Sequence, residues 1–266
     1  MNYSMKIKEG KNIMDTLKIG RKNNFAIIEI DNGKVNAINE NLAKDLGAAF
    51  DMLDKDEEVK GVILSGRPHC FSAGLDIMSL AQGGREGSKQ FWRAYLVALQ
   101  SMVRFSKPFV CAITGYAPAG ATIFTLCADY RVMGKGEKHK IGMHEFKMSM
   151  LIPELMCDIY AYHLGEKLAW KMVQQAQLFN SDEALALGLV DESVEVDIVL
   201  ERAEKHLKKL VGIHPPIFKK SKAYFRKDLL KLIDRPIEPM VEVIDQNSED
   251  PFVKESLKMF LMSLKK

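Results

Sequence analysis

Short, continuously apolar runs alternate with helix-spaced apolar positions over the first two thirds of the chain. Such runs predict buried strands at 25–30, 59–64, 109–113 and 129–133. Apolar residues that recur at helical spacing predict helices from Asn39, through 91–102, from 151–154, over 170–177, and from 181 to Gly188. This alternation indicates an α/β fold with parallel strand pairing and right-handed crossovers.

Beyond residue 195 the pattern becomes almost entirely helical. We expect helices over 198–211, 216–232 and 241–264, separated by breaks that contain proline. The chain is therefore predicted to have two parts, an α/β core at 16–200 and a helical region at 201–266. Residues 1–15 are expected to form a mobile arm.

Two of the predicted strands lead into turns made of glycine, proline and small side chains. The strand at 109–113 runs into 114–122, and the strand at 59–64 runs into 65–77. Small residues leave backbone N–H groups open to a ligand, and at a helix start these groups are unpaired and favour negative charge. We therefore expect 114–122 to supply half of an oxyanion hole.

Composition narrows the functional classes. The chain has 266 residues, 47% of them hydrophobic, and a net charge of +3, which is too weak to indicate nucleic-acid binding. Its four cysteines form no CxxC pair, which argues against zinc and disulfides and fits a reducing compartment. There is no apolar run of about 18 residues and no secretory signal pattern near the N-terminus, so we expect a cytoplasmic protein without a membrane span. A mitochondrial presequence is the open alternative, and the acidic residues within 1–24 argue against it.

The two turns together resemble a known superfamily. The segment Phe71-Ser72-Ala73-Gly74-Leu75-Asp76, with Gly115-Tyr116-Ala117-Pro118-Ala119-Gly120-Ala121, is similar to the crotonases, the enoyl-CoA hydratases and isomerases. The resemblance covers nearly the whole chain. It is closest to the mitochondrial-type 3,2-trans-enoyl-CoA isomerases, which have a similar Ala-Gly-Leu-Asp, a similar Pro-Ala-Gly turn and a stretch like 127–131.

This resemblance implies a fold, a ligand and an assembly. The fold would be a crotonase-like spiral of ββα units at 16–200, with a C-terminal helical module at 201–266 that forms trimers or dimers of trimers. The ligand would be an acyl-coenzyme A thioester, bound as substrate without a separate cofactor or metal. Its thioester oxygen would lie between the N–H groups of Leu75 and Gly120. The implied substrate-binding residues are Ala37, Ala73, Gly74, Leu75, Asp76, Ile77 and Gly120.

The resemblance also points to a catalytic carboxylate. Hydratases of the superfamily hold a water between two glutamates, whose positions here are Ile123 and Glu145, while some isomerases use an acid at the position of Glu154. One carboxylate in an apolar pocket can move a proton from C2 to C4, whereas water addition wants a second. The isoleucine at 123 therefore favours isomerisation. We name Glu145 and Glu154 as candidate bases; the alternative for each is a surface or helix-capping role.

Other activities and roles stay open at this stage. The chain could instead be an enoyl-CoA hydratase, another crotonase-type lyase or hydrolase, or a non-catalytic relative that binds coenzyme A or RNA. His144 is expected to orient a loop or face solvent, and Trp92 and Tyr95 to lie in the core or line an acyl tunnel. Asp129 and Arg131 are interpreted as a structural pair. The tail lysines are expected on a solvated helix face or near coenzyme A phosphates: Lys208, Lys209, Lys219, Lys220 and Lys222.

Overall fold

The fold is built on a six-stranded sheet that is parallel except at one edge. A computed structural model describes residues 14–263, so nearly all of the expected arm at 1–15 lies outside the described residues. The strand order is β1 (Leu17–Lys22), β2 (Phe25–Ile30), β3 (Val62–Ser65), β5 (Phe109–Ile113), β7 (Tyr130–Gly134) and β9 (Glu192–Val194). Only β1 and β2 pair antiparallel. The sequence pattern had not predicted β1.

A second, three-stranded parallel sheet runs through both small-residue turns. Its strands are β4 (His69–Cys70), β6 (Gly115–Pro118) and β8 (Ile141–Gly142). The segments at 65–77 and 114–122 are therefore short strands as well as turns. Three successive coils, β3–β4, β5–β6 and β7–β8, each contribute one strand to each sheet and then lead into a helix, which confirms the predicted spiral of ββα units.

The helices confirm most of the expected positions. They are α1 (Glu40–Lys55), α2 (Ile77–Gln82), α3 (Gly84–Arg104), α4 (Gly120–Leu126), α5 (Glu154–Leu164), α6 (Glu166–Gln175), α7 (Ser181–Leu187) and α8 (Val199–Val211), with 3-10 turns η1 (Glu145–Met148) and η2 (Val196–Ile198). Asn39 caps α1 through its side chain, as the sequence predicts. Asn180 and Glu183 form a capping box on α7, which begins at Ser181 and is capped at its end by Gly188, as expected.

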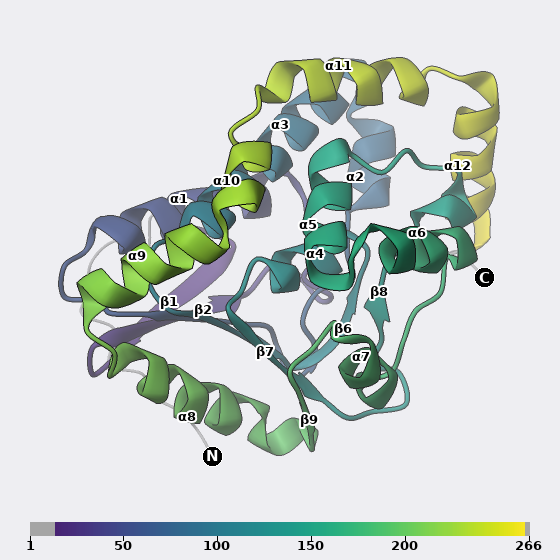
Figure 1. The fold of residues 1–266 in the computed structure, drawn as a ribbon. Helices are drawn as coiled ribbons and strands as arrows, with labels where there is room; N and C mark the ends of the chain where they lie inside the picture. The colour runs from purple at the N-terminus through teal and green to yellow at the C-terminus, as the bar shows by residue number, and fades with distance from the viewer. Residues whose placement is uncertain (1–13, 264–266) are drawn as a thin grey trace.

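The two faces of the large sheet are covered differently. Helices α1 and α3 pack together over one face, and α8 lies across the other (Figure 1). A smaller hydrophobic core lies between α8 and the sheet. It consists of side chains from β2, β3, β5 and β7 packed against one face of α8: Phe25, Ile27, Ile63, Val110, Ala112, Val132, Val199, Ala203 and Leu207. Helix α8 spans the expected boundary at 200/201, so the chain beyond residue 200 continues directly from a helix of this core.

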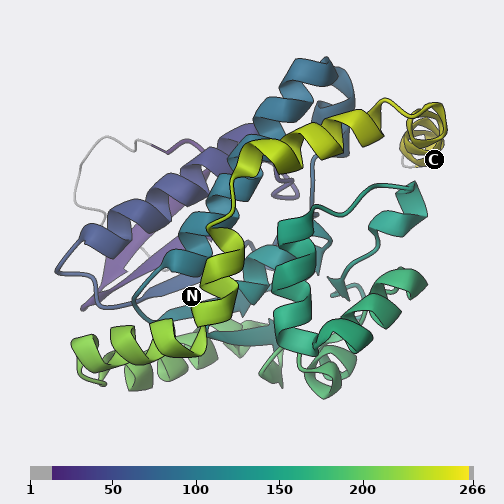
Figure 2. The same ribbon diagram turned by 45° about the horizontal axis from the view of Figure 1, so that its top comes forward.

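The C-terminal helices are shorter than the sequence pattern predicted. The expected helix at 216–232 is divided at Arg226 into α9 (Pro215–Phe225) and α10 (Lys227–Ile233), and the one at 241–264 consists of α11 (Ile237–Ser248) and α12 (Pro251–Ser263). Pro251 has no N–H with which to continue the preceding helix. At this break Arg226 has φ −94° and ψ 9°, and its guanidinium donates to the carbonyls of Cys127 and Ala128. Figure 2 shows α11 lying along α3, with α12 at the end of the molecule.

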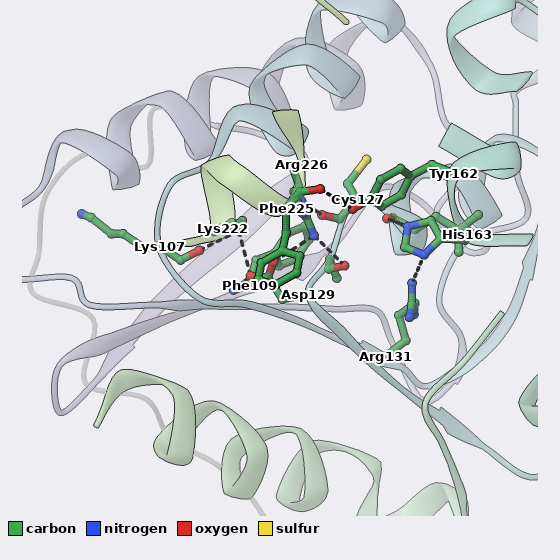
Figure 3. A network of polar contacts seen from close by, with 12 residues as sticks. Lys107, Phe109, Cys127, Asp129, Arg131, Tyr162, His163, Lys222, Phe225 and Arg226 are labelled. Atoms are coloured by element: carbon green, nitrogen blue, oxygen red, sulfur yellow. Dashed lines mark hydrogen bonds and ion pairs between the residues drawn. The ribbon is translucent and has the colours of Figure 1, made fainter. Parts of the chain in front are cut away.

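The expected ion pair between Asp129 and Arg131 is wrong. Arg131 instead makes a bidentate contact with Asp191 and a 2.8 Å contact with the Nδ1 atom of His163. Asp129 binds Lys222 at 2.7 Å and Arg226 at 2.8 Å, both from the C-terminal helices (Figure 3). Asp129 and Arg131 are therefore neutralised separately, each by oppositely charged side chains from later parts of the chain.

This network also corrects the expectation for Lys222. Its side chain is buried, and its ammonium group donates to Asp129 and to the carbonyl of Lys107. Burial lowers the pKa of Lys222 to about 8 despite the nearby carboxylate. Lys222 therefore links the helical region to the sheet and belongs to neither a solvated face nor an anion site.

The described part of the chain has neither a membrane-spanning helix nor a metal-ligand cluster. Among residues 14–263, no helix combines the length and the apolar character needed to cross a bilayer. The same residues contain no cluster of three or more His, Cys, Asp or Glu side chains arranged to hold a metal ion.

Candidate active site

The two small-residue turns meet at Leu75 and Gly120. Gly74 accepts a hydrogen bond from the N–H of Ile38, and Asp76 donates one back to the Ile38 carbonyl, so the intervening N–H of Leu75 faces the other way. The N–H of Gly120 opens α4. Neither of these two N–H groups donates a hydrogen bond to another group within residues 14–263.

Two side chains pack closely against Gly120. A methyl group on Gly120 would lie 2.5 Å from Cδ2 of Leu75 and 3.0 Å from the Tyr95 hydroxyl oxygen. The hydroxyl of Tyr95 donates to the carbonyl of Gly120 at 2.9 Å. Two unpaired amides are thus held in contacting residues, an arrangement that can receive a negatively charged oxygen.

The turn before α4 is held in a strained conformation. Ala119 has φ 54° and ψ −125°, which an L-residue rarely adopts and which costs about 1–3 kcal/mol. Its N–H donates to the carbonyl of Gly142 at 2.8 Å, while Thr122 donates to the carbonyl of Ala117 and accepts from the N–H of Gly142. These buried bonds fix the orientation of the Gly120 amide.

A buried polar pair that the sequence analysis missed supports the other turn. Asn36 has φ 50°, and its side-chain amide donates to the carbonyls of Ile30 and Phe71. The Ser72 hydroxyl donates to the carbonyl of Asn36 at 2.6 Å and accepts from the N–H of Gly74 at 3.1 Å. The asparagine at 36 was a signal for this, because Asn tolerates positive φ better than most residues.

The residues expected to bind substrate lie together in two adjacent segments. The N–H of Ala73 donates to the carbonyl of Val35, so 35–38 runs beside 73–76. Ala37 and Ala73 are half-buried, and Ile77 is buried at the start of α2. The carboxylate of Asp76 caps α2 by accepting from the N–H and hydroxyl of Ser79. Because its carboxylate is used in this cap, Asp76 offers a ligand mainly its backbone, along with the rest of 73–76.

Glu145 lies at the first position of η1, three residues after β8. Its side chain is 1% exposed, and neither carboxylate oxygen has a hydrogen-bond partner within residues 14–263. Burial raises the pKa of Glu145 to about 7. Burial raises the pKa of the Tyr95 hydroxyl, which binds Gly120, and the charge of Glu145 adds to this shift.

Glu154 is placed quite differently, in the first turn of α5. Its side chain is 62% exposed and forms an ion pair with Arg235 at 2.6 Å. The positive end of the helix dipole stabilises a carboxylate at this position. Glu154 therefore has the helix-surface role that was the alternative to a catalytic one. The half-buried His144 has a pKa lowered by burial, and its Nδ1 atom has no partner within the described residues.

Apolar side chains fill the remaining positions. Ile123 on α4 is completely buried, so the position that a second acid would occupy is aliphatic. Trp92 and Tyr95 are buried in the core at helical spacing on α3. Beside them is a cavity of about 550 Å³ between α2, α3, α11 and α12, a volume suited to a small organic ligand. Its apolar lining includes Ile77, Leu80, Trp92, Leu151, Ile244, Leu257 and Leu261.

Comparison with known proteins agrees with this architecture. The sequence profile described as enoyl-CoA hydratase/isomerase matches residues 20–266. The mitochondrial enoyl-CoA delta isomerase 1 of Mus musculus is 29% identical over 90% of this chain and 83% of its own length. A probable enoyl-CoA hydratase of Mycobacterium avium is 31% identical over 67% of this chain and 69% of its own length.

A solved structure extends the likeness to the fold. The crystal structure of human mitochondrial delta3-delta2-enoyl-CoA isomerase superposes with a TM-score of 0.90 and 25% identity, over 94% of this chain and 98% of that one. The chain, with its two-sheet spiral and C-terminal helices, belongs to the enoyl-CoA hydratase/isomerase family of the crotonase superfamily.

Proposed function

We propose that this protein is a 3,2-trans-enoyl-CoA isomerase that moves a double bond through a thioester enolate. The observation that carries the proposal is Glu145, a single buried carboxylate whose oxygens have no hydrogen-bond partner in the described part of the chain. Position 123, where a second acid would be expected in a hydratase, holds a buried isoleucine, which agrees with a site that has a single acid–base group. The named relatives, which include isomerases, agree with it.

The reaction follows from the charges that develop. The carboxylate of Glu145 removes a proton from C2, and the electron pair of that C–H bond forms the enolate, with negative charge on the thioester oxygen. The N–H groups of Leu75 and Gly120 donate to that oxygen; one such donor is worth about 2.7–4 kcal/mol in a protease. The protonated Glu145 then delivers the proton to C4, which re-forms the thioester carbonyl and leaves the double bond between C2 and C3.

The raised pKa of Glu145 suits both halves of this cycle. A base with a pKa of about 7 is substantially ionised near neutral pH, yet its conjugate acid gives the proton back readily. Only protons move, so the reaction needs no resident cofactor or metal. In this proposal coenzyme A enters only as part of the substrate, along the edge formed by Ala37, Ala73, Gly74, Asp76 and Ile77.

The apolar cavity is the proposed place for the acyl chain. Its wall contains Trp92 from α3 and Ile77, which adjoins the Leu75 turn. Helices α11 and α12 close the other side. Acyl groups of different length would contact these C-terminal helices to different extents.

An enoyl-CoA hydratase is the second candidate function, because several relatives carry that name. We propose to separate the two by assaying purified protein with 3-enoyl-CoA and with 2-enoyl-CoA. Turnover of the 3-enoyl substrate is expected, and its loss in Glu145→Ala but not in Glu154→Ala would support the assigned base. Hydration of 2-enoyl-CoA without any isomerisation, or loss of activity through Glu154→Ala alone, would refute the assignment.

We also propose a homotrimer or a dimer of trimers. Helix α9 exposes apolar side chains, including Ile217, Tyr224 and the 84% exposed Phe225. Burying such residues against another copy would remove apolar surface from water. Light scattering coupled to gel filtration would give the mass, and a monomer at micromolar concentration would contradict this assembly.

A further inference from the structure

A row of ion pairs joins α3 to α11 beside the apolar cavity. Its basic members lie on α3 at intervals of four residues, so they share one face of that helix. Its acidic members lie on α11, which runs along α3 (Figure 2). The pairs are Arg85–Asp245 at 2.6 Å, Lys89–Glu242 at 2.8 Å and Arg93–Glu238 at 2.6 Å.

The pair between Arg85 and Asp245 differs from the other two. The Asp245 side chain is 2% exposed, whereas those of Glu242 and Glu238 are 51% and 60% exposed. The guanidinium of Arg85 donates to both carboxylate oxygens of Asp245, and Lys89 adds a contact at 3.3 Å. Exposed pairs contribute little to stability, but an enclosed carboxylate depends on its cation. This pair is therefore the ionic contact that fixes the end of α11 against α3.

The same contact connects two walls of the cavity. Arg85 lines the cavity from α3, while Ile244 and Ser248, which lie on either side of Asp245 in the chain, line it from α11. Helix α12 follows directly after α11 and completes that second wall. The separation of α3 and α11 at this point therefore determines the width of the cavity.

Helix α12 has little apolar packing of its own to hold it in place. Residues 251–262 include no fully buried side chain, and Leu257 and Leu261, which line the cavity, are only partly buried. The helix contacts α11 and also η1, the turn that carries Glu145. Because an element with few buried contacts opens more readily than the core, the position of α12 depends on the position of α11.

We propose that Arg85 and Asp245 are positioning residues that hold α11 and α12 over the acyl chain and so set the preference of the enzyme for long acyl groups. A long chain fills the cavity as far as the wall formed by these two helices. A short one ends nearer to Ile77, which follows the Leu75 turn. This inference rests on the proposed function, because it takes the cavity to be the acyl site.

The size of the effect follows from the methylene groups of the chain. Each methylene group that moves from water into an apolar site increases the affinity about fourfold. Loss of the ion pair would let α11 and α12 move outward and return about two of these groups to water, which lowers the affinity about tenfold. A short acyl group has fewer methylene groups at this wall to lose.

The test is binding of two saturated thioesters, butanoyl-CoA and dodecanoyl-CoA, measured by isothermal titration calorimetry. A saturated chain has no double bond to move, so the measurement does not depend on turnover. Wild-type protein should bind dodecanoyl-CoA more tightly. In Arg85→Gln and in Asp245→Asn the ratio of the two Kd values should fall about tenfold, chiefly through dodecanoyl-CoA. Arg85→Lys, which keeps the charge, should restore most of the ratio.

Arg104→Gln is the matched control. Arg104 lies on the same helix and binds Asp234 with two donors at 3.0 and 2.7 Å, but neither residue is among those of 14–263 that line the cavity. This variant should keep the wild-type ratio of Kd values. The Arg85 and Asp245 variants should stay folded, because α11 also buries apolar side chains in the main core: Met240, Val241 and Ile244.

Three results would overturn the inference. One is a wild-type protein that binds the two thioesters equally, which decides the matter even if a variant fails to fold. Another is a wild-type ratio in folded Arg85→Gln and Asp245→Asn, and the third is an equal fall of the ratio in Arg104→Gln. A protein with the expected ratios that does not isomerise 3-enoyl-CoA would instead refute the proposed function, so the two failures are distinguishable.

Discussion

Replacing Glu145 with glutamine should make the protein more stable and less active, and the gain in stability should depend on pH. The unfolded carboxyl ionises near its ordinary pKa of 4.5, and the folded one near 7. Between these values the folded chain keeps a proton that the unfolded chain has lost, so the free energy of unfolding falls as the pH rises. Above pH 7 the burial of this charge costs about 3 kcal/mol.

Glu145→Gln removes that cost because its side chain is never charged. At pH 8 it should be about 2–3 kcal/mol more stable than wild type, which corresponds to a melting temperature about 4–10 °C higher for a chain of this size. At pH 5 the two proteins should differ little. Activity should fall about 10²- to 10⁴-fold when the base is lost.

Thermal unfolding at pH 5 and pH 8, with kcat/KM measured across the same range, checks both parts. Wild-type kcat/KM should rise with pH through about 7 and then level off, because the base must be ionised. Glu154→Gln is the control. Its exposed ion pair with Arg235 is worth at most about 1 kcal/mol, so the substitution should change the stability by a similar small amount at pH 5 and at pH 8. A Glu145→Gln variant that gains no stability at pH 8 relative to pH 5 would refute the reasoning.

Two further predictions concern the paired amides and the buried ion cluster. Gly120→Ala should lower kcat by up to about 10²- to 10³-fold, the cost of one lost oxyanion donor, because its methyl group would push on the Leu75 side chain and on the Tyr95 hydroxyl that binds the Gly120 carbonyl. Steady-state kinetics would check this, and an unchanged kcat would contradict it. Asp129→Asn should lower the free energy of unfolding by about 3–5 kcal/mol, since Lys222 and Arg226 would keep their buried charges without a counter-ion. Denaturant unfolding measures that loss, and a change below about 1 kcal/mol would show that the cluster relaxes.

Local patterns were sufficient for most of the core helices and strands and for the two turns. Helix α1 with its Asn39 cap and strand β5 follow from short-range periodicity, which depends on neighbours in the chain. The small-residue composition around Gly120 also predicted a turn with an open backbone. The missed strand β1 and the divided C-terminal helices depend on partners outside the segment itself. Strand β1 forms through its ladder with β2, and Arg226, at the break between α9 and α10, binds carbonyls about a hundred residues earlier.

The sequence by itself therefore determined the fold class, the two turns that bring Leu75 and Gly120 together, and the aliphatic residue at 123. It offered two candidate bases, Glu145 and Glu154, and could not rank their surroundings, because burial and charge pairing are sums over residues distant in the chain. Only the tertiary structure separated them. It encloses Glu145 among apolar side chains, where its charge is costly and its pKa rises, and it leaves Glu154 in water beside Arg235.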